Sequence, residues 1–460
     1  MRIAIFTETF YPEINGVVTF LKNITEKLSA QGHEIRIYCP KYPKKAFRKP
    51  YYPSKNVSVY RAFSIKLITN PASRVTIPNV IKVFRDFKRF NPDIVHLQSP
   101  LLIGEVGFLC GKLYRKPVIS TYHTFLPDFA KYISPLRIAR VILINKLIGR
   151  MRRKARKVIE EDNPQEIKRF LKKKVNKKKE KELTAKFRKV KKLNEASIWV
   201  ITRLMYSTHD LITAPSRVMA KILREKRVNR KVLFLSNGIE LDKFRPMPKP
   251  KRDEIMLLHS GRISFEKNVD VLLNSFKLVS DKCPQARLWI VGDGPSQPEL
   301  KKLAGKLRIS DKVKFFGALP REELISLYQK ADFFVTASTI ETQGIVVLEA
   351  MASGLPVVGV KALALSELIR DGQNGFLASP FNPRDFAEKC IRLIESSDIL
   401  EKMAQNAPSS IKEHDLDFVV ERLICIYERA ICDKTKKLEK KKKKRKLALR
   451  NKNKRLKKPA

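Results

Sequence analysis

Short apolar runs alternate with stretches of helical periodicity along most of the chain. Residues 2–7 form such a run, a loop ending at Asn15 and Gly16 follows, and residues 17–28 then carry apolar side chains at helical spacing. Residues 33–39 form the next apolar run. Two strands joined through a crossover helix lie parallel in one sheet. The amino terminus therefore predicts the start of a parallel α/β sheet.

The same alternation occurs twice, which predicts two domains. In the first half we expect further strands at residues 93–99, 117–123 and 210–215, and a second series follows at 255–261, 287–292, 313–317, 332–337 and 356–360. Alternating strands and helices are typical of a parallel sheet with helices on both faces. We therefore predict an α/β protein with two Rossmann-like, doubly wound parallel-sheet domains that face a cleft. The predicted domains cover residues 1–215 and 232–412, and a closing helix covers residues 413–433.

The charge of the chain is large and unevenly distributed. The 460 residues carry a formal net charge of +49. Two Lys-rich segments hold more than half of it, because residues 150–192 contribute +14 and residues 434–460 contribute +15. Such segments are solvated rather than packed in a core. We therefore predict an insertion at about residues 150–193, either a helical hairpin or disordered, and a basic tail at 434–460, both suited to a polyanionic partner.

The hydropathy of the chain predicts neither a membrane span nor secretion. No apolar stretch approaches the roughly 20 residues that cross a bilayer. The apolar run at the amino terminus is short, and Glu8 interrupts it where the hydrophobic region of a signal peptide would continue. We therefore expect no transmembrane helix, no signal peptide and a cytoplasmic protein. The basic segments predict a peripheral position on the inner face of the cell membrane.

The segment from Glu341 to Glu349 contains the most informative candidate residues. Gly344 begins a helix in which Glu349 stands among apolar residues, and a buried carboxylate requires partners such as hydroxyl groups. The backbone N–H groups of Gln343, Gly344 and Ile345 lie at the predicted amino terminus of this helix, where a diphosphate could bind. Glu341 would lie beside the group attached to that diphosphate. A capping carboxylate and an exposed helical glutamate are the alternative interpretation.

Two cations follow the first strand of the second series. Arg262 and Lys267 lie between the strand at 255–261 and the helix that begins near Asn268. When the bond between a sugar and a diphosphate breaks, negative charge grows on the diphosphate, and fixed cations stabilise it. No Asp-x-Asp motif follows these strands to hold a divalent metal, so we expect no metal requirement. Taken alone, both cations could be surface charges.

In the first half of the chain, Gly16 and His123 are candidate ligand contacts. Gly16 follows Asn15 after the first strand, where a residue without a side chain lets the backbone approach a phosphate or a sugar. His123 ends the strand at 117–123 and therefore lies at the carboxyl edge of the sheet, where ligands bind. Ordinary turn chemistry for Gly16 and a structural role for His123 are the alternatives.

Together these motifs resemble the family 4 retaining glycosyltransferases of GT-B architecture. The resemblance covers roughly residues 1–433 apart from the insertion. It rests on the Glu-x7-Glu spacing, the Gly-Arg-x4-Lys-Asn segment at 261–268, the Asn-Gly pair at 15–16 and the Ser-Asn-Gly-Ile-Glu segment at 236–240. It implies roles for the candidate residues: Glu341 contacts the donor sugar, Glu349 holds the ribose, Arg262 and Lys267 neutralise the diphosphate, Gly16 closes over the donor, and His123 touches the sugar.

Two motifs resemble the diacylglycerol glucosyltransferase branch of that family. They are Glu-Thr-Gln-Gly at 341–344, where many members have Phe before the glycine, and Thr-Tyr-His-Thr at 121–124. This resemblance implies a hexosyltransferase that moves glucose from UDP-glucose to a membrane glycerolipid such as diacylglycerol. It implies an acceptor-binding N-terminal domain, a nucleotide-sugar donor substrate and no bound cofactor. The implied partners are the nucleotide sugar, the lipid acceptor and an anionic membrane surface.

The sequence leaves alternatives open. Residues 80–89 predict an amphipathic basic helix that either lies on anionic lipid or packs on the sheet with one solvated face. The same architecture would suit a soluble polysaccharide or phosphoinositol-type acceptor. In another functional class, the net charge would suit a nucleic-acid-binding protein. The basic segments, however, carry few aromatic residues to stack on bases, so we expect no nucleic-acid partner.

Overall fold

The computed structural model of the chain describes residues 1–13, 15–43, 46, 54–67, 70–99, 101–123, 195–249 and 252–456. These residues divide into two compact units. The N-terminal unit takes its described residues from Met1–Thr213, Leu223–Leu233 and Val420–Ala460, and the C-terminal unit takes them from Ala214–Ile222 and Phe234–Val419. The insertion predicted at residues 150–193 lies outside the described residues.

The N-terminal unit contains the first predicted sheet. Its described strands lie in the order β3-β2-β1-β6-β7-β8-β9, and the registered pairs from β3 to β8 are parallel. The strands are β1 (Arg2–Phe6), β2 (Glu34–Pro40), β3 (Val57–Ala62), β6 (Ile94–Leu97), β7 (Val118–Thr121), β8 (Leu211–Ala214) and β9 (Val232–Phe234). The parallel sheet predicted from the alternating pattern is confirmed.

Helix α1 shows how the sequence pattern produces the helices around this sheet. The side chain of Asn15 caps the helix by accepting a hydrogen bond from the backbone N–H of Val18 at 3.0 Å. Phe20, Ile24 and Leu28 recur at helical spacing and are buried. The described helices here are α1 (Gly16–Ala30), α2 (Val80–Phe90), α3 (Leu102–Leu113), α8 (Glu195–Tyr206) and α9 (Arg217–Glu225), of which α9 is shared with the C-terminal unit.

Helix α2 packs its apolar face into the core of the N-terminal unit. Val83 and Phe87 are buried there. The Asp86 carboxylate accepts two hydrogen bonds from the Arg36 guanidinium, at 2.6 and 3.0 Å, and one from the Tyr38 hydroxyl at 2.9 Å. These contacts fix α2 against β2. Val83 and Phe87 therefore cannot lie in lipid, because the core of the N-terminal unit already covers them, and the packing supports the interpretation of a helix with one solvated face.

A small antiparallel hairpin that the sequence pattern did not predict precedes α2. It consists of β4 (Ser64–Leu67) and β5 (Asn70–Thr76). Its inner residues Ser64 and Thr76 are buried, and the Thr76 hydroxyl donates a hydrogen bond to the Glu8 carboxylate at 2.5 Å. The hairpin is therefore attached to the loop that follows β1.

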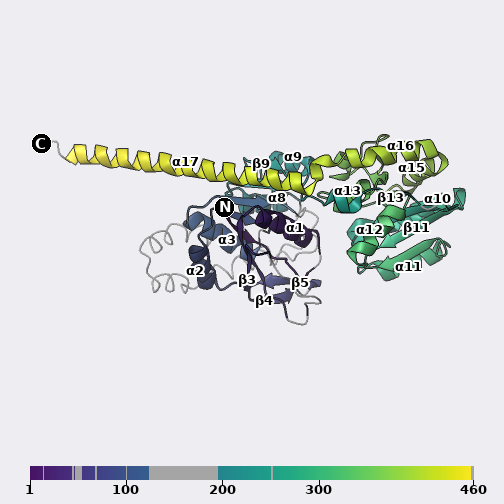
Figure 1. Cartoon of the computed structure of the whole chain (residues 1–460), viewed down its shortest axis with the longest axis horizontal. Helices are drawn as coiled ribbons and strands as arrows, with labels where there is room; N and C mark the ends of the chain where they lie inside the picture. The colour runs from purple at the N-terminus through teal and green to yellow at the C-terminus, as the bar shows by residue number, and fades with distance from the viewer. Residues whose placement is uncertain are drawn as a thin grey trace. The chain divides into compact units, whose positions relative to one another are not determined.

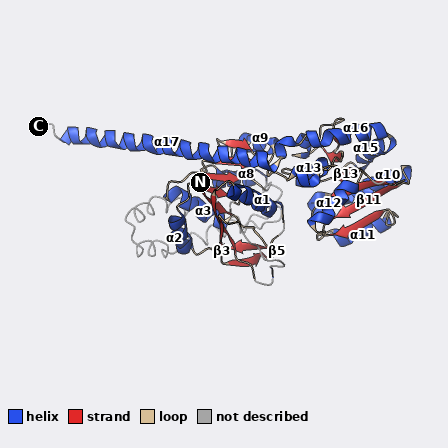
Figure 2. Cartoon of the chain, in the orientation of Figure 1, coloured by secondary structure: helices blue, strands red, loops and turns tan. Residues whose placement is uncertain are grey.

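The C-terminal unit contains the second predicted sheet (Figure 2). Its described strands lie in the order β12-β11-β10-β13-β14-β15 and pair in parallel. They are β10 (Ile255–Ser260), β11 (Ala286–Val291), β12 (Val313–Gly317), β13 (Phe333–Thr336), β14 (Val357–Val360) and β15 (Gly375–Ala378). All five strands predicted for this half are present, and β15 was not predicted.

Helices follow the strands of the second sheet and bury a continuous apolar core against it. They are α10 (Val269–Lys282), α11 (Gln297–Lys306), α12 (Arg321–Lys330), α13 (Ile345–Ala352), α14 (Leu365–Leu368), α15 (Pro383–Glu395) and α16 (Ser397–Ser409). Three short 3₁₀ turns are also described: η3 (Leu241–Phe244), η4 (Phe265–Lys267) and η5 (Lys412–His414).

Each sheet has one point where the strand order reverses. In the N-terminal sheet the chain winds outward from β1 to β2 and β3 and then returns to β6 on the other side of β1. In the C-terminal sheet it winds from β10 to β11 and β12 and returns to β13 on the other side of β10. Open α/β sheets bind ligands at the carboxyl ends of the strands beside such a reversal. Ligand sites are therefore expected after β1 and β6, and after β10 and β13.

The last described helix, α17 (Leu416–Leu456), is 41 residues long (Figure 1). It contains most of the closing helix predicted at 413–433, beginning three residues later, and continues through most of the predicted basic tail. Tyr427 attaches it to the N-terminal unit, because its hydroxyl lies 2.6 Å from Nδ1 of His96. Lys434 continues this attachment through an ion pair with Asp210 at 2.9 Å. Among the described helices, none is both long and apolar enough to cross a membrane.

Candidate active site

Two loops beside the strand-order reversal of the C-terminal sheet carry most of the predicted site residues. One loop connects β10 to α10 and contains Arg262 and Lys267. The other connects β13 to α13 and contains Glu341 and Gly344. β10 and β13 are paired neighbours, so the two loops leave the same edge of the sheet side by side.

Lys267 and Glu341 form an ion pair that joins these two loops. The Lys267 ammonium donates a hydrogen bond to Oε1 of Glu341 at 2.5 Å. Burial disfavours the ionised form of Glu341, but the charge and hydrogen bond of Lys267 outweigh it and lower the pKa of this carboxyl. Glu341 is therefore a carboxylate at neutral pH and can only accept hydrogen bonds. An ammonium has three N–H donors, and one of them is used here.

A further buried group at the same strand ends was missed in the sequence. His259, near the end of β10, donates a hydrogen bond from Nδ1 to the carbonyl of Val335 at 2.9 Å. Burial lowers the pKa of His259 to about 4, and its ring interacts electrostatically with Lys267 and Glu341. Within the described residues, Nε2 of His259 has no hydrogen-bond partner. The site therefore has hydrogen-bonding capacity that the described chain does not use.

Arg262 is exposed on a loop whose backbone is held rigidly. Its side chain makes no hydrogen bond or ion pair with the described residues, so it can bind an anion. The N–H of Ile263 donates to the carbonyl of Asp293 at 3.0 Å. Gly292 lies so close to this loop that a Cβ there would be 1.8 Å from the carbonyl oxygen of Gly261. Only glycine fits at this position, and the close approach fixes the segment that presents Arg262.

Helix α13 begins after Gly344, and the side chain of Gln343 fixes the preceding loop through hydrogen bonds. Gly344 has a φ of +78°, a left-handed conformation that favours glycine. The Gln343 side chain is buried, accepts a hydrogen bond from the N–H of Asn237 at 3.2 Å and donates one to Ser236 Oγ at 2.8 Å. Its amide therefore positions the loop. The backbone N–H groups at Gly344 and Ile345 belong to the first turn of α13, where an anion could accept from them.

Glu349 lies inside α13, where it is 5% exposed. Tyr328 donates a hydrogen bond to its Oε2 at 3.2 Å, and the Arg321 guanidinium approaches its Oε1 at 3.4 Å. Burial raises the pKa of Glu349, and Arg321 and Tyr328 only partly offset this. The predicted buried carboxylate is therefore present, and its two partners on α12 were not predicted from the sequence.

At the N-terminal sheet, Gly16 and His123 lie at the carboxyl edge as predicted. Gly16 is exposed and begins α1. His123 follows β7, and its Nε2 lies 2.6 Å from Oε1 of Gln98, which follows β6. The ring of His123 packs edge-on against Phe20 of α1. Burial lowers the pKa of His123 to about 3, so the imidazole is neutral at neutral pH.

Comparison with known families decides the class of protein. A model described as Glycosyl transferases group 1 matches residues 242–410, and a model described as Glycosyltransferase Family 4 matches residues 14–159. The first match contains the strand-order reversal of the C-terminal sheet, and the second contains β6 of the N-terminal sheet. The chain is a family 4 glycosyltransferase.

Curated relatives of this glycosyltransferase include lipid-modifying enzymes. It is 28% identical to the alpha-monoglucosyldiacylglycerol synthase of Streptococcus pneumoniae over 82% of this chain and 75% of the relative. It is 26% identical to the enzyme of the same name from Acholeplasma laidlawii over 96% of this chain and 100% of the relative. A D-inositol 3-phosphate glycosyltransferase of Streptomyces griseus is 29% identical over 44% of this chain and 49% of the relative.

A solved structure supports the fold of the glycosyltransferase. The Anabaena protein Alr3699/HepE in complex with UDP aligns with a TM-score of 0.64 at 18% identity, covering 93% of this chain and 100% of that protein. The similarity confirms the predicted GT-B fold.

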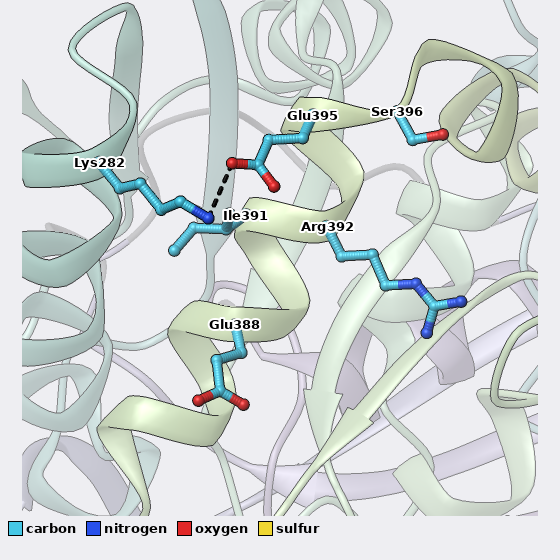
Figure 3. A pocket seen from close by; sticks show the side chains of 6 residues that line it. All are labelled: Lys282, Glu388, Ile391, Arg392, Glu395 and Ser396. Carbon is cyan, nitrogen blue, oxygen red and sulfur yellow. Dashed lines mark ion pairs between the residues drawn. The ribbon is translucent and has the colours of Figure 1, made fainter.

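A surface hollow elsewhere on the C-terminal unit contains none of the predicted site residues of the glycosyltransferase. It is lined by Lys282 of α10 and by Glu388, Ile391, Arg392, Glu395 and Ser396 at α15. Figure 3 shows the Lys282 and Glu395 side chains pointing toward each other, and they form an ion pair at 2.9 Å. This hollow is a surface feature of the α10–α15 packing and not the candidate site.

Proposed function

We propose that this glycosyltransferase moves glucose from UDP-glucose, with retention of configuration, to a membrane glycerolipid such as diacylglycerol. The observation that carries the proposal is the Lys267–Glu341 ion pair at the strand-order reversal of the C-terminal sheet. Arg262 and the amino terminus of α13 lie on the same two loops. These groups supply the two functions that a nucleotide-sugar donor requires, namely anion binding and sugar binding.

The ion pair brings together the two side chains to which we assign these functions. One N–H of the Lys267 ammonium can maintain the hydrogen bond to Glu341, and another can donate to the phosphate oxygen that departs with the nucleotide. Glu341, as a carboxylate, can accept hydrogen bonds from the sugar hydroxyls. The bond that breaks joins the sugar to that phosphate, so it would lie beside both side chains. Arg262 and the N–H groups of Gly344 and Ile345 would hold the remaining diphosphate charge.

Glu349 and His123 complete the proposed donor contacts. Glu349, oriented by Tyr328 and Arg321, would accept hydrogen bonds from the ribose hydroxyls. His123 would contact the transferred sugar, and Gly16 would let the backbone close over the donor. These roles follow the family resemblance residue by residue. The Anabaena protein was solved in complex with UDP, and this supports a uridine nucleotide as the carrier of the sugar.

The surface of the β4–β5 hairpin supports a lipid acceptor. Phe63 is 63% exposed, and Ile65 and Ile77 are 48% and 46% exposed. Ile77 donates a backbone hydrogen bond to Phe63 at 2.7 Å, and Ile65 lies two positions from Phe63 on the same face. The basic residue Lys66 is exposed on the same hairpin. A contiguous apolar face on a hairpin that also exposes a cation suits the interface of an anionic bilayer.

The basic segments would add an electrostatic attraction to the same membrane. Residues 434–460 contain 16 basic residues and one acidic residue, and α17 runs through most of them. Each Lys or Arg near an anionic leaflet contributes about 1 kcal/mol. This supports a peripheral position on the inner face of the membrane, with the insertion at about residues 150–193 as a second basic segment.

A donor and acceptor panel tests the proposal. Radiolabelled UDP- and GDP-sugars are incubated with the full chain and detergent-dispersed diacylglycerol, in excess chelator and again with added Mg²⁺ or Mn²⁺. We expect one UDP-hexose to label the lipid, equal rates with and without metal, and a product with the same anomeric configuration as the donor. An inverted product would remove the chain from the retaining group, and a metal requirement would contradict the role given to Arg262 and Lys267.

A soluble acceptor is the second candidate within the same enzyme class. The similarity to the Streptomyces enzyme that is named for D-inositol 3-phosphate favours it. The same panel therefore includes inositol phosphate and a polysaccharide. Transfer to either one, with no labelled lipid, would replace the lipid proposal.

A further inference from the structure

Strands β6 and β7 carry two consecutive side-chain pairs on one face of the N-terminal sheet. In the first pair, Nε2 of His96 lies 2.7 Å from the hydroxyl of Thr121. In the second, Nε2 of His123 lies 2.6 Å from Oε1 of Gln98. Both pairs join residues that are 25 positions apart. The first pair lies within the strands, and the second lies at the carboxyl edge beside the strand-order reversal.

The two pairs differ in how completely they are satisfied. Both ring nitrogens of His96 are hydrogen-bonded, one to Thr121 and the other to Tyr427 at 2.6 Å. At the edge, Gln98 is 4% exposed and its amide nitrogen has no hydrogen-bond partner among the described residues. A buried, unpaired N–H₂ group is costly unless something else accepts from it. The pair at the ligand-binding edge is therefore the incomplete one.

The Gln98–His123 contact also determines which nitrogen of His123 carries the proton. Burial keeps the imidazole neutral, and a neutral imidazole has one N–H. Because Oε1 of Gln98 can only accept, Nε2 of His123 is the donor, and Nδ1 carries the lone pair. His96, which interacts electrostatically with His123, is itself buried and neutral. Gln98 is held in place by its own backbone N–H, which donates to the carbonyl of Phe6 at 2.9 Å.

We propose that Gln98 is a specificity-determining residue, which fixes the Nε2–H form of His123 and donates its free amide N–H to a hydroxyl of the transferred sugar. This inference rests on the proposed contact between His123 and that sugar. A sugar oxygen at this position would satisfy the buried amide nitrogen. A donor sugar without that hydroxyl would leave it unpaired, so the enzyme would discriminate against the deoxy sugar.

Monodeoxy analogues of the donor sugar test the inference. With the wild-type chain and detergent-dispersed acceptor, we expect one analogue in the series to lose about tenfold in kcat/KM relative to the parent donor, the worth of one neutral hydrogen bond. In Gln98→Met this penalty should fall to about twofold or less, because the side chain keeps its size but has no N–H. Gln98→Glu, which can accept from His123 but cannot donate, should lose the same discrimination.

Two variants separate recognition from packing. Thr121→Val removes a partner from the complete pair on the same strands, and Gln31→Met makes the same chemical change at an exposed position. Both should retain the tenfold penalty, even if Thr121→Val lowers the thermal stability. In a double-mutant cycle, Gln98→Met should have little further effect once His123→Ala is present, because the two side chains act together.

The outcomes are distinguishable. An active wild type whose discrimination is unchanged by Gln98→Met, or a Gln98→Met variant that slows all analogues equally, would overturn the inference and leave the proposed function standing. A folded wild type that transfers none of the parent sugars would overturn the proposed function, and this inference with it.

Discussion

The carboxyl edges of the two sheets are built from different chemistry. At the C-terminal sheet the candidate residues are mostly charged: Arg262, Lys267, Glu341 and Glu349. At the N-terminal sheet the candidates Gly16, Gln98 and His123 are neutral, since burial keeps the His123 imidazole uncharged. Glu8, a carboxyl group in the loop after β1, has a raised pKa because it is buried, and it accepts hydrogen bonds from the backbone N–H groups of Thr76 and Ile103.

This difference matches two different tasks. Breaking the bond between a sugar and a diphosphate creates charge, and the C-terminal edge has fixed charges to stabilise it. A sugar hydroxyl and a lipid are uncharged, and they are recognised by neutral hydrogen-bonding groups and apolar surface. The N-terminal edge and the exposed β4–β5 hairpin provide these. The comparison therefore predicts that substitutions in the C-terminal unit affect the chemical step and donor binding, and that those in the N-terminal unit affect selectivity and membrane attachment.

The largest expected effect is at Lys267. Lys267→Ala should lower kcat by about 100-fold to 1,000-fold, because it removes the fixed cation that we propose at the leaving group and leaves the Glu341 carboxylate without its ion-pair partner. Arg262→Ala should lower kcat by about 100-fold, near the lower end of this range, because the Arg262 side chain is exposed. Steady-state kinetics with saturating donor measure both. A folded double variant with near-normal turnover would break the comparison, since the C-terminal charges would then have no catalytic role.

The second effect concerns the tail in the N-terminal unit. Deleting residues 435–460, which spares the ion pair between Lys434 and Asp210, should weaken binding to anionic vesicles by about 100-fold if about three basic residues engage the surface. Co-sedimentation with anionic and neutral vesicles measures this. The attraction should fade toward about 1 M salt as the Debye length shortens. Activity on a detergent-dispersed acceptor should persist.

Equal binding of the full-length chain to neutral and anionic vesicles would contradict the electrostatic part of this proposal. RNA offered as a competitor provides a further check. If RNA displaced the chain from anionic vesicles at physiological salt, a nucleic acid would become the better partner for the tail.

The third effect concerns donor binding. Glu349→Gln should raise the KM for the donor about tenfold and leave kcat nearly unchanged, because its contacts with the ribose would be the same before and during bond cleavage. Tyr328→Phe removes a hydroxyl that orients Glu349 and should give a smaller increase in KM. Initial rates over a range of donor concentrations measure both. A fall in kcat with an unchanged KM would place Glu349 in the chemical step instead.

The sequence predicted the sheets and the charged edge better than it predicted the surface. Five of the six described strands of the C-terminal sheet could be predicted because each is a short apolar run followed by a helical pattern. Arg262, Lys267 and Glu341 were identified from their positions after such strands. The ion pair between Lys267 and Glu341 joins residues 74 positions apart, so no local pattern could show it. The same holds for the contact between Gln98 and His123, which are 25 positions apart and meet because β6 and β7 are neighbours.

Helix α2 shows a different limit of sequence reasoning. Its apolar residues recur at helical spacing, and this pattern is identical whether the face contacts a lipid or a sheet. Only the packing of Val83 and Phe87 against the N-terminal core decides between the two. The hairpin before it was missed because β4 is only four residues long and carries a lysine.

The fourth effect tests the hairpin as the apolar contact with lipid. Phe63→Ser should weaken vesicle binding by about fivefold, since the side chain would be only partly inserted and full burial contributes about 1.5–3 kcal/mol. Unlike the effect of the tail, this loss should remain at high salt. Phe381→Ser is the matched control, because Phe381 is 64% exposed on the C-terminal unit. Equal losses in the two variants would show that the hairpin has no special role.

The last prediction concerns how the kinetics depend on pH. The expected effect is the smallest at neutral pH, but it is the sharpest test of the charges at the C-terminal edge. Burial raises the pKa of Glu349 above the ordinary value of 4.5, whereas Lys267 lowers the pKa of Glu341 below 4.5 despite its burial. As the pH falls, the group with the raised pKa is protonated first. Between the two pKa values Glu349 is neutral and Glu341 is still a carboxylate.

The KM for the donor should therefore rise before kcat falls when rates are measured from about pH 8 down to about pH 5. Glu349→Gln provides the control, because glutamine does not titrate: its KM should already be high at neutral pH and should stay constant over this range. If kcat fell first in the wild type, Glu341 would be the group protonated at the higher pH. Lys267 would then not be holding it ionised, and the pairing of charges that distinguishes this edge from that of the N-terminal sheet would not operate in solution.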